Sequence, residues 1–313
     1  MHVTRALVDA GFDAKAAALT NDPAKIVRVI EKSRADVVMN LCDTLGGVGS
    51  AALVVPAILE SLGVPFAGAS TSGMALSKRK HDVKAVLSRE ALPTPRYQVI
   101  HEANDIAEFV LKLMPPVIVK LSGEHASIGL EQASVCVDER EVKARARAMF
   151  AKFPEQPLLI EEYVDGKELA VSFHGHPLQV APAVEHAFDH VPEGFLKLRT
   201  FDMKWTEQAG FVDHARETAR AVAVPVRAPT VDAGWSLDGL IEACGRAFEV
   251  IGCRDWGRVD VRIDKGGVPL IIDVTPNTFL GPNGPCAKAA LAGGVDYTTL
   301  VARIVNGALA RRR

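Results

Sequence analysis

Residues 255–277 read DWGRVDVRIDKGGVPLIIDVTPN, and this stretch predicts a β-hairpin. Apolar and charged residues alternate over 258–264, which is the period of a half-buried strand. The turn is expected at Gly266 and Gly267, because glycine adopts a positive φ at little cost. The apolar run from Val268 onward predicts a second, more buried strand.

Each predicted strand carries a carboxylate in its polar row, Asp260 in the first and Asp273 in the second. Antiparallel neighbours can bring such residues within about 5 Å, Cβ to Cβ. Two carboxylates that close repel unless a cation or a proton separates them, and magnesium prefers oxygen ligands. Asn277 follows the second strand and offers a neutral oxygen, while Arg258 shares the face of Asp260. A surface hairpin with alternating charges accounts for the same spacing.

A resemblance to a known family favours the functional interpretation. Residues 252–261 read GCRDWGRVDV and residues 270–277 read LIIDVTPN. Both segments resemble the C-terminal motif of D-alanine–D-alanine ligases, members of the ATP-grasp superfamily of carboxylate–amine ligases, and the match extends over most of the chain. The resemblance implies an α/β protein (α+β overall) with a three-part ATP-grasp architecture. Its expected parts are a truncated N-terminal Rossmann-like domain at 1–76, a central ATP-grasp lid domain at 77–175 and a C-terminal catalytic domain at 176–313.

Composition sets broad limits on the class of protein. The 313 residues are 48% hydrophobic and 24% charged with a net charge of −2, which is ordinary for a soluble globular protein. This balance gives no reason to expect nucleic acid or membrane as a partner. Five cysteines without a CxxC pair favour a reduced, cytoplasmic compartment. The terminal arginines 311–313 are expected to be a frayed, solvated helix end.

Strand and helix patterns alternate over residues 14–68, which predicts a parallel sheet with covering helices. Strands are expected at 14–19, 37–41 and 64–68. The resembling ligases usually begin with a further strand. A lost strand, a misplaced start or another element at that edge would each explain the difference. The glycine-rich loop at 40–50 is either an anion cradle at a helix N-terminus or a plain connection.

The resemblance also implies a set of ATP-phosphate ligands. Lys80 takes the place of a family Asp-Lys lysine, although Arg79 replaces the aspartate. Lys120 ends an apolar strand, where an unpaired charge would be costly to bury. Ser127 keeps the second of two loop serines, and Lys204 matches another ATP-contacting lysine.

The segment 158–168 resembles the adenine hinge of the same family. The resemblance implies that the backbone of Glu162 and Val164 binds the purine edge. It places Glu161 beside the amino group of the purine, and it makes Glu168 the acceptor for the ribose hydroxyls. A hairpin turn with exposed acidic residues would explain the same segment equally well.

The mechanism implied by the resemblance is a two-step ligation through an acyl phosphate. The cofactors would be ATP and magnesium, with manganese as the alternative ion, and the metal ligands would be Asp260, Asp273 and Asn277. Arg258 would stabilise the acyl oxyanion. The partners would be a small carboxylate and an amine, and a homodimer through the N-terminal layer is left open.

Departures from the family pattern lie on the substrate side, at 43–50, 126, 205 and 284. They predict a substrate pair other than two D-alanines. The metal set also departs, because Asp273 and Thr275 stand where Glu and Asn are usual. The alternative hypothesis is therefore a non-catalytic, nucleotide-binding relative, such as a pseudoenzyme or regulatory module.

Overall fold

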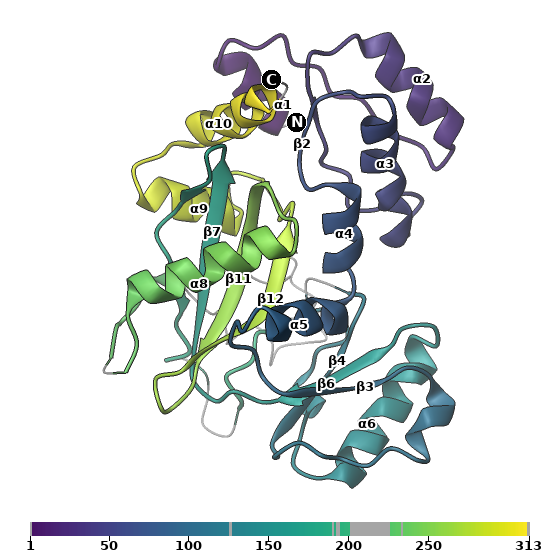
Figure 1. Ribbon diagram of the computed structural model, residues 1–313, viewed down its shortest axis with the longest axis vertical. Coiled ribbons are helices and arrows are strands. Elements are labelled where there is room, and N and C mark those ends of the chain that lie inside the picture. Colours follow the sequence, from purple (N-terminus) through teal and green to yellow (C-terminus); the bar gives the residue numbers. More distant parts are fainter. Residues whose placement is uncertain are drawn as a thin grey trace, which may run out of the picture.

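The computed structural model describes residues 2–124, 127–189, 191, 195–200, 226–232 and 234–311. Three sheets organise these residues, with the two ends of the chain on the same side of the molecule (Figure 1). The largest has the strand order β10-β9-β7-β11-β12 with β8 also paired to β7, the second has the order β3-β6-β4-β5, and the smallest is the pair β1-β2. Together with the helices they form the mixed α/β architecture expected from the sequence.

The N-terminal layer contains two parallel strands and the helices around them. Its elements are α1 (His2–Asp9), α2 (Pro23–Ser33), β1 (Val38–Met39), the 3-10 turn Ser50–Leu53, α3 (Val54–Ser61), β2 (Phe66–Ala67) and α4 (Thr71–Ser77). Asp22 caps α2 by accepting from the backbone N–H groups of Ala24 and Lys25, with Pro23 in the first turn. The strand expected at 14–19 does not form. Residues 15–18 are exposed, so a strand there would bury no apolar face.

The edge of β2 that faces away from β1 is covered by side chains. Arg311 donates to the carbonyl oxygen of Phe66 at 3.0 Å. Asp255 accepts from the N–H of Gly68 at 2.7 Å, and Arg254 donates to the Gly68 carbonyl at 2.6 Å. Arg311 also forms an ion pair with Asp255, whose side chain is fully buried. Arg311 is therefore held in place, and the expectation of a solvated end is wrong for this residue.

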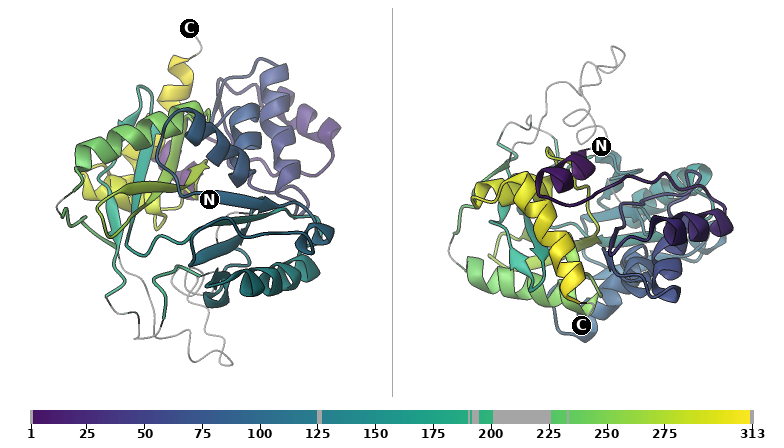
Figure 2. Two further views of the ribbon diagram at one scale, coloured as in Figure 1. Left: turned by 60° about the horizontal axis from the view of Figure 1, so that its bottom comes forward. Right: turned by 90° about the horizontal axis from the view of Figure 1, so that it is seen from above.

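The central part of the chain folds around the four-stranded sheet. It contains α5 (Lys80–Arg89), β3 (Tyr97–Ile100), β4 (Val117–Leu121), β5 (Val135–Cys136), α6 (Glu139–Lys152) and β6 (Leu158–Glu162), with 3-10 turns at Ala103–Ile106 and Gln132–Ser134. Asp138 caps α6, whose apolar residues Val142, Ala146, Met149 and Phe150 pack on the sheet. Figure 2 shows this helix on one face of the sheet, away from the rest of the molecule.

The C-terminal part contains the predicted hairpin. Its elements are β7 (Lys167–Gly175), β8 (Gln179–Val180), β9 (Val184–His186), β10 (Val226–Arg227), α8 (Leu237–Val250), β11 (Asp255–Ile263), β12 (Pro269–Pro276), α9 (Pro285–Ala292) and α10 (Tyr297–Ala310). Strands β11 and β12 pair antiparallel, with a bulge between Asp260 and Val261. Gly267 has φ +81 in the turn, as its position predicts.

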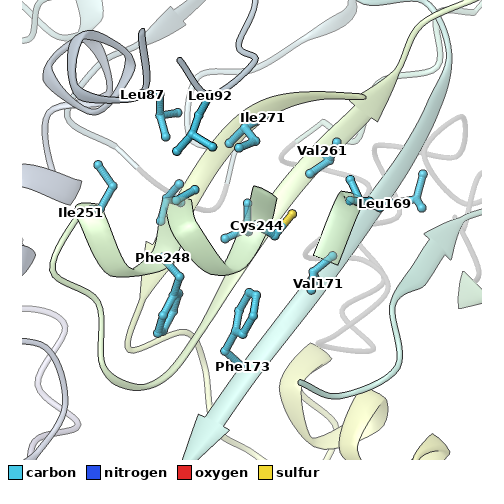
Figure 3. Packing of buried hydrophobic residues seen from close by; sticks show 14 of the residues in the cluster. Leu87, Leu92, Leu169, Val171, Phe173, Cys244, Phe248, Ile251, Val261 and Ile271 are labelled. Atoms are coloured by element: carbon cyan, nitrogen blue, oxygen red, sulfur yellow. The ribbon is translucent and has the colours of Figure 1, made fainter. Parts of the chain in front are cut away.

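Two different environments cover the faces of the large sheet. On one face, α8 packs on apolar residues of β7, β11 and β12 (Figure 3). There the rings of Phe173 and Phe248 stack with their centroids 4.9 Å apart. On the other face, α9 and α10 cover the end that holds Trp256. The remainder of that face carries charged side chains, and these form the candidate site.

The domain boundaries drawn from the sequence need one adjustment. The range 77–175 includes β7, yet β7 pairs along its whole length with β11 of the large sheet. We propose that the central domain ends before Lys167. Among the residues that the structure describes, none of the helices combines the length and apolar character needed to cross a membrane.

Candidate functional site

A polar row runs along the open face of the large sheet. We use this name for Glu168 on β7, Arg258, Asp260 and Arg262 on β11, and Asp273 on β12. Asp260 lies directly opposite Asp273, and Arg262 lies directly opposite Glu168. The sequence prediction that the hairpin brings Asp260 and Asp273 together is therefore confirmed. Side chains opposite each other on antiparallel strands share a face, which places all five on one surface.

Arg258 and Asp260 form a bidentate pair within the row. The Nε of Arg258 lies 2.6 Å from one carboxylate oxygen and its Nη2 lies 2.8 Å from the other. Burial by itself would lower the pKa of Arg258, but the charge of Asp260, helped by Asp273 and Glu168, raises it above its ordinary value. The guanidinium therefore remains charged within hydrogen-bond reach of the carboxylate pair.

Asp273 is paired with Lys80 from α5. The ammonium of Lys80 lies 3.1 and 3.2 Å from the two carboxylate oxygens, and its side chain is 8% exposed. Lys80 therefore belongs to the same cluster as the two carboxylates. Within the described ranges, no three His, Cys, Asp or Glu side chains gather at one point. A magnesium ion held by Asp260 and Asp273 would complete its coordination with water and phosphate oxygens, which is how this ion is usually bound.

Asn277 points toward the N-terminal layer. Its side-chain oxygen accepts from the N–H of Ala69 at 2.8 Å, and its amide nitrogen lies 3.7 Å from the sulfur of Met74. The residue has φ +49, so the chain turns where β12 ends. The metal-binding role of Asn277 stays a prediction, while its contact with the N-terminal layer is the finding.

Lys120 on β4 and Glu161 on β6 lie at the base of the central sheet and form an ion pair. Glu161 also pairs with Lys84 of α5, whose ammonium is 2.7 Å from Oε2. Burial alone would raise the pKa of Glu161, but the charges of Lys120 and Lys84 lower it. Lys84 was missed by the sequence analysis. Its position one helical turn after Lys80, on a face with apolar neighbours, was the available signal.

The predicted adenine hinge is a short connection between β6 and β7. Gly166 lies so close to β11 that a Cβ there would overlap the carbonyl oxygen of Ile263. The carboxylate of Glu162 accepts a hydrogen bond from the N–H of Met114 at 3.1 Å. The carbonyl of Val164 accepts from Arg262 at 3.0 Å, and Glu168 accepts from the same guanidinium at 2.6 Å. Arg262, a second residue missed by the sequence analysis, therefore connects the hinge to the polar row.

The loop after β4 is described only in part. The hydroxyl of Ser127 donates to the carbonyl of Arg199 at 2.8 Å, so this loop contacts the segment that leads toward residue 201. Lys204, the third lysine predicted to bind phosphate, lies outside the described residues. Positions 126 and 205 on the substrate side also lie outside them.

The glycine-rich loop closes on itself. Leu45 and Val48 exchange backbone hydrogen bonds at 3.1 and 3.0 Å, and Gly46 and Gly47 have φ +59 and +81. This is the geometry of a two-residue turn that requires positive φ twice, so the plain connection explains its glycines. Three apolar side chains of this loop and of the segment after β12 are exposed, Leu41 at 48%, Val48 at 53% and Phe279 at 61%.

Comparisons with known proteins agree with this geometry. The family model described as D-ala D-ala ligase C-terminus matches residues 86–306. A D-alanine–D-alanine ligase from Synechococcus sp. (strain JA-3-3Ab) is 30% identical over 272 residues, which cover 85% of this chain and 75% of the relative. An uncharacterized protein, y4sG, from Sinorhizobium fredii (strain NBRC 101917 / NGR234) is 28% identical over 260 residues, which cover 83% of this chain and 70% of the relative.

A solved structure extends the likeness to the whole fold. The structure of D-alanine–D-alanine ligase from Bacillus anthracis, complexed with ATP, matches with a TM-score of 0.71 at 18% identity. The match covers 99% of this chain and 91% of that chain. At this identity the likeness establishes the fold, and the chemistry has to be argued from the residues.

Proposed function

Because the chain belongs to the D-alanine–D-alanine ligase family of ATP-grasp proteins, we propose that it is an ATP-dependent ligase that joins a carboxylate to an amine and releases ADP and phosphate. One observation carries the proposal. Asp260 and Asp273 face each other across the hairpin, with Arg258 and Lys80 as their immediate cationic neighbours. This arrangement suits a phosphoryl transfer, in which positioning and charge stabilisation supply most of the catalysis.

The reaction would proceed in two steps. An oxygen of the substrate carboxylate attacks the γ-phosphorus of ATP, and the bond from that phosphorus to the β–γ bridging oxygen breaks. The products of this step are ADP and an acyl phosphate. The amine nitrogen then attacks the acyl carbon, phosphate leaves with the electron pair of its C–O bond, and the nitrogen loses a proton to solvent. Holding the two reactants together supplies much of the rate, so no nucleophilic side chain is needed.

Six side chains of the site receive roles in this scheme. Arg258 would donate to the oxyanion that forms when the amine attacks. Lys80 and Lys120 would neutralise phosphate oxygens, and Glu168 would accept from the ribose. Asp260 and Asp273 would hold a magnesium ion, which supplies charge neutralisation between phosphate oxygens when it is bound.

We propose further that the substrates differ from two D-alanines. The turn at residues 45–48 is closed by its own backbone, and Gly284 begins α9 without a side-chain cap. A panel of D- and L-amino acids, hydroxy acids and dipeptides, graded by side-chain size, tests this part.

A non-catalytic nucleotide-binding protein is the second candidate function. It is favoured by the state of the metal set, in which Asp273 pairs with Lys80 and Asn277 contacts the N-terminal layer. Such a protein would bind nucleotide without any substrate-dependent release of phosphate.

The deciding experiment measures ADP release by the purified chain with ATP, magnesium and each substrate pool. We expect one pool to stimulate release and Asp260→Asn to lower the stimulated rate at least a hundredfold. Asp238→Asn is the matched control, because Asp238 is exposed on α8, on the other face of the sheet. ATP binding with no stimulation by any pool would favour the non-catalytic candidate. Failure of the wild-type chain to bind ATP would contradict both.

A further inference from the structure

Glu161 is a buried carboxylate shared by two lysines. Its side chain is 4% exposed, and it pairs with Lys120 through one oxygen and with Lys84 through the other. The two lysines come from different parts of the fold, since Lys120 lies on β4 of the central sheet and Lys84 lies on α5. Each carboxylate oxygen therefore faces an ammonium group.

Lys84 connects this cluster to the β11–β12 hairpin. Its ammonium donates to the hydroxyl of Thr94 at 2.8 Å, and that hydroxyl donates to the carbonyl of Ile271 on β12 at 2.7 Å. The N–H of Ile271 in turn donates to the carbonyl of Pro93 at 2.8 Å. The chain entering the central domain is therefore bonded to β12, and Lys84 links that junction to Glu161.

The charges make Glu161 necessary to this arrangement. Burial lowers the pKa of Lys84, the charge of Lys120 lowers it further, and the charge of Glu161 opposes both, with Asp273 adding a smaller effect. Without the carboxylate, two ammonium groups would share a region from which water is largely excluded. One of them would have to lose its proton or move away.

We propose that Glu161 is a positioning residue that holds the ammonium of Lys120 in place for the phosphates of the nucleotide and, through the buried Lys84, ties the central domain to the β11–β12 hairpin. The inference rests on the proposed function, because the proposed function makes Lys120 a ligand of the phosphates. The role beside the purine amino group that the sequence resemblance implied for Glu161 stays a prediction.

The test compares the binding of two probes, magnesium–ATP and adenosine, by equilibrium titration. In Glu161→Gln, ATP binding is expected to weaken at least tenfold while adenosine binding changes less than twofold. Glu161→Asp keeps the charge and is expected to recover most of the ATP affinity. Glu131→Gln is the matched control, because Glu131 also pairs with two cations of the central domain, Arg145 and Lys152, but is 53% exposed.

Each other outcome contradicts a defined part of the argument. Equal loss of ATP and adenosine binding, or wild-type ATP binding in Glu161→Gln, overturns the positioning role alone. Absence of ATP binding by the wild-type chain overturns the proposed function and this inference with it. If Glu161→Gln does not fold, the double variant Lys84→Met with Glu161→Gln removes both buried charges together. That variant is expected to fold and to bind ATP at least tenfold more weakly, and wild-type affinity in it would overturn the proposal.

Discussion

The β11–β12 hairpin is attached to the rest of the molecule on two sides, and the two junctions differ in kind. On its turn side, β12 meets the central domain through Ile271, Thr94 and Lys84. On its open side, β11 meets the N-terminal layer through Asp255, which pairs with Arg311 and accepts from Gly68. Both junctions contain a buried carboxylate satisfied by basic side chains.

The difference lies in what each junction is used for. If Lys120 binds nucleotide as proposed, the Lys84–Glu161 junction lies beside a ligand on which its charges would act. The Asp255–Arg311 junction lies at the C-terminal end of α10, and we propose no ligand there, so its charges are expected to act on stability alone. Buried ion pairs of similar construction can therefore have different uses, and only experiments that separate binding from stability will distinguish them.

The largest effect on stability is expected at the open side. Arg311→Ala removes both guanidinium contacts to Asp255 and leaves a buried carboxylate with only the Gly68 N–H. Removing one partner of a buried pair costs about 3–5 kcal/mol, and Arg311 should fall at the low end because it is 23% exposed. Urea unfolding measures the change. Arg303→Ala on the same helix, whose guanidinium bonds the neutral Gln179, is the control and should change little. A loss equal to that of the control would mean that Asp255 finds another partner.

The next effect is expected in the polar row and concerns rate. Arg258→Lys keeps the charge but loses the planar fork of two nitrogens, Nε and Nη2, that makes the pair with Asp260 bidentate. If Arg258 stabilises the oxyanion, kcat should fall about 10²–10³-fold while the affinity for ATP changes little, which is typical of losing an oxyanion donor. Steady-state kinetics with the substrate found by ADP release measures both. An unchanged kcat would remove Arg258 from the mechanism.

The sequence predicted residues on regular strands better than it predicted either junction, and the reason is physical. The carboxylates of the hairpin and the lysine on β4 belong to regular strands, where alternation and register fix the face of each side chain. Lys84 was missed because its partners come from β6 and from the chain after α5, at distances in sequence that no periodicity reports. Arg311 was misjudged because a terminal basic run is normally solvated. Its partner Asp255 is distant in sequence, so the residues around Arg311 give no sign of a buried carboxylate.

The same limit applies to Asn277 and to the expected strand at 14–19. The positive φ of Asn277 turns its amide toward Ala69, and the neighbours that favour this turn lie in the N-terminal layer. The sequence of residues 15–18 is compatible with a strand, but these residues have no apolar face to bury. In both cases the deciding interaction, or its absence, is tertiary.

The smallest effect is expected at the hairpin turn, where an ion pair joins the same hairpin to the hinge but lies in water. Lys265 is 2.8 Å from Asp165, and their side chains are 82% and 45% exposed. Solvent and side-chain entropy offset nearly all of the attraction between such exposed groups. Lys265→Ala should therefore leave the urea midpoint unchanged within error and should not alter ATP affinity. Urea unfolding and ATP titration, run side by side with Arg311→Ala, would check both. If the two variants lost similar stability, burial would not be what separates the strong junctions from the weak one.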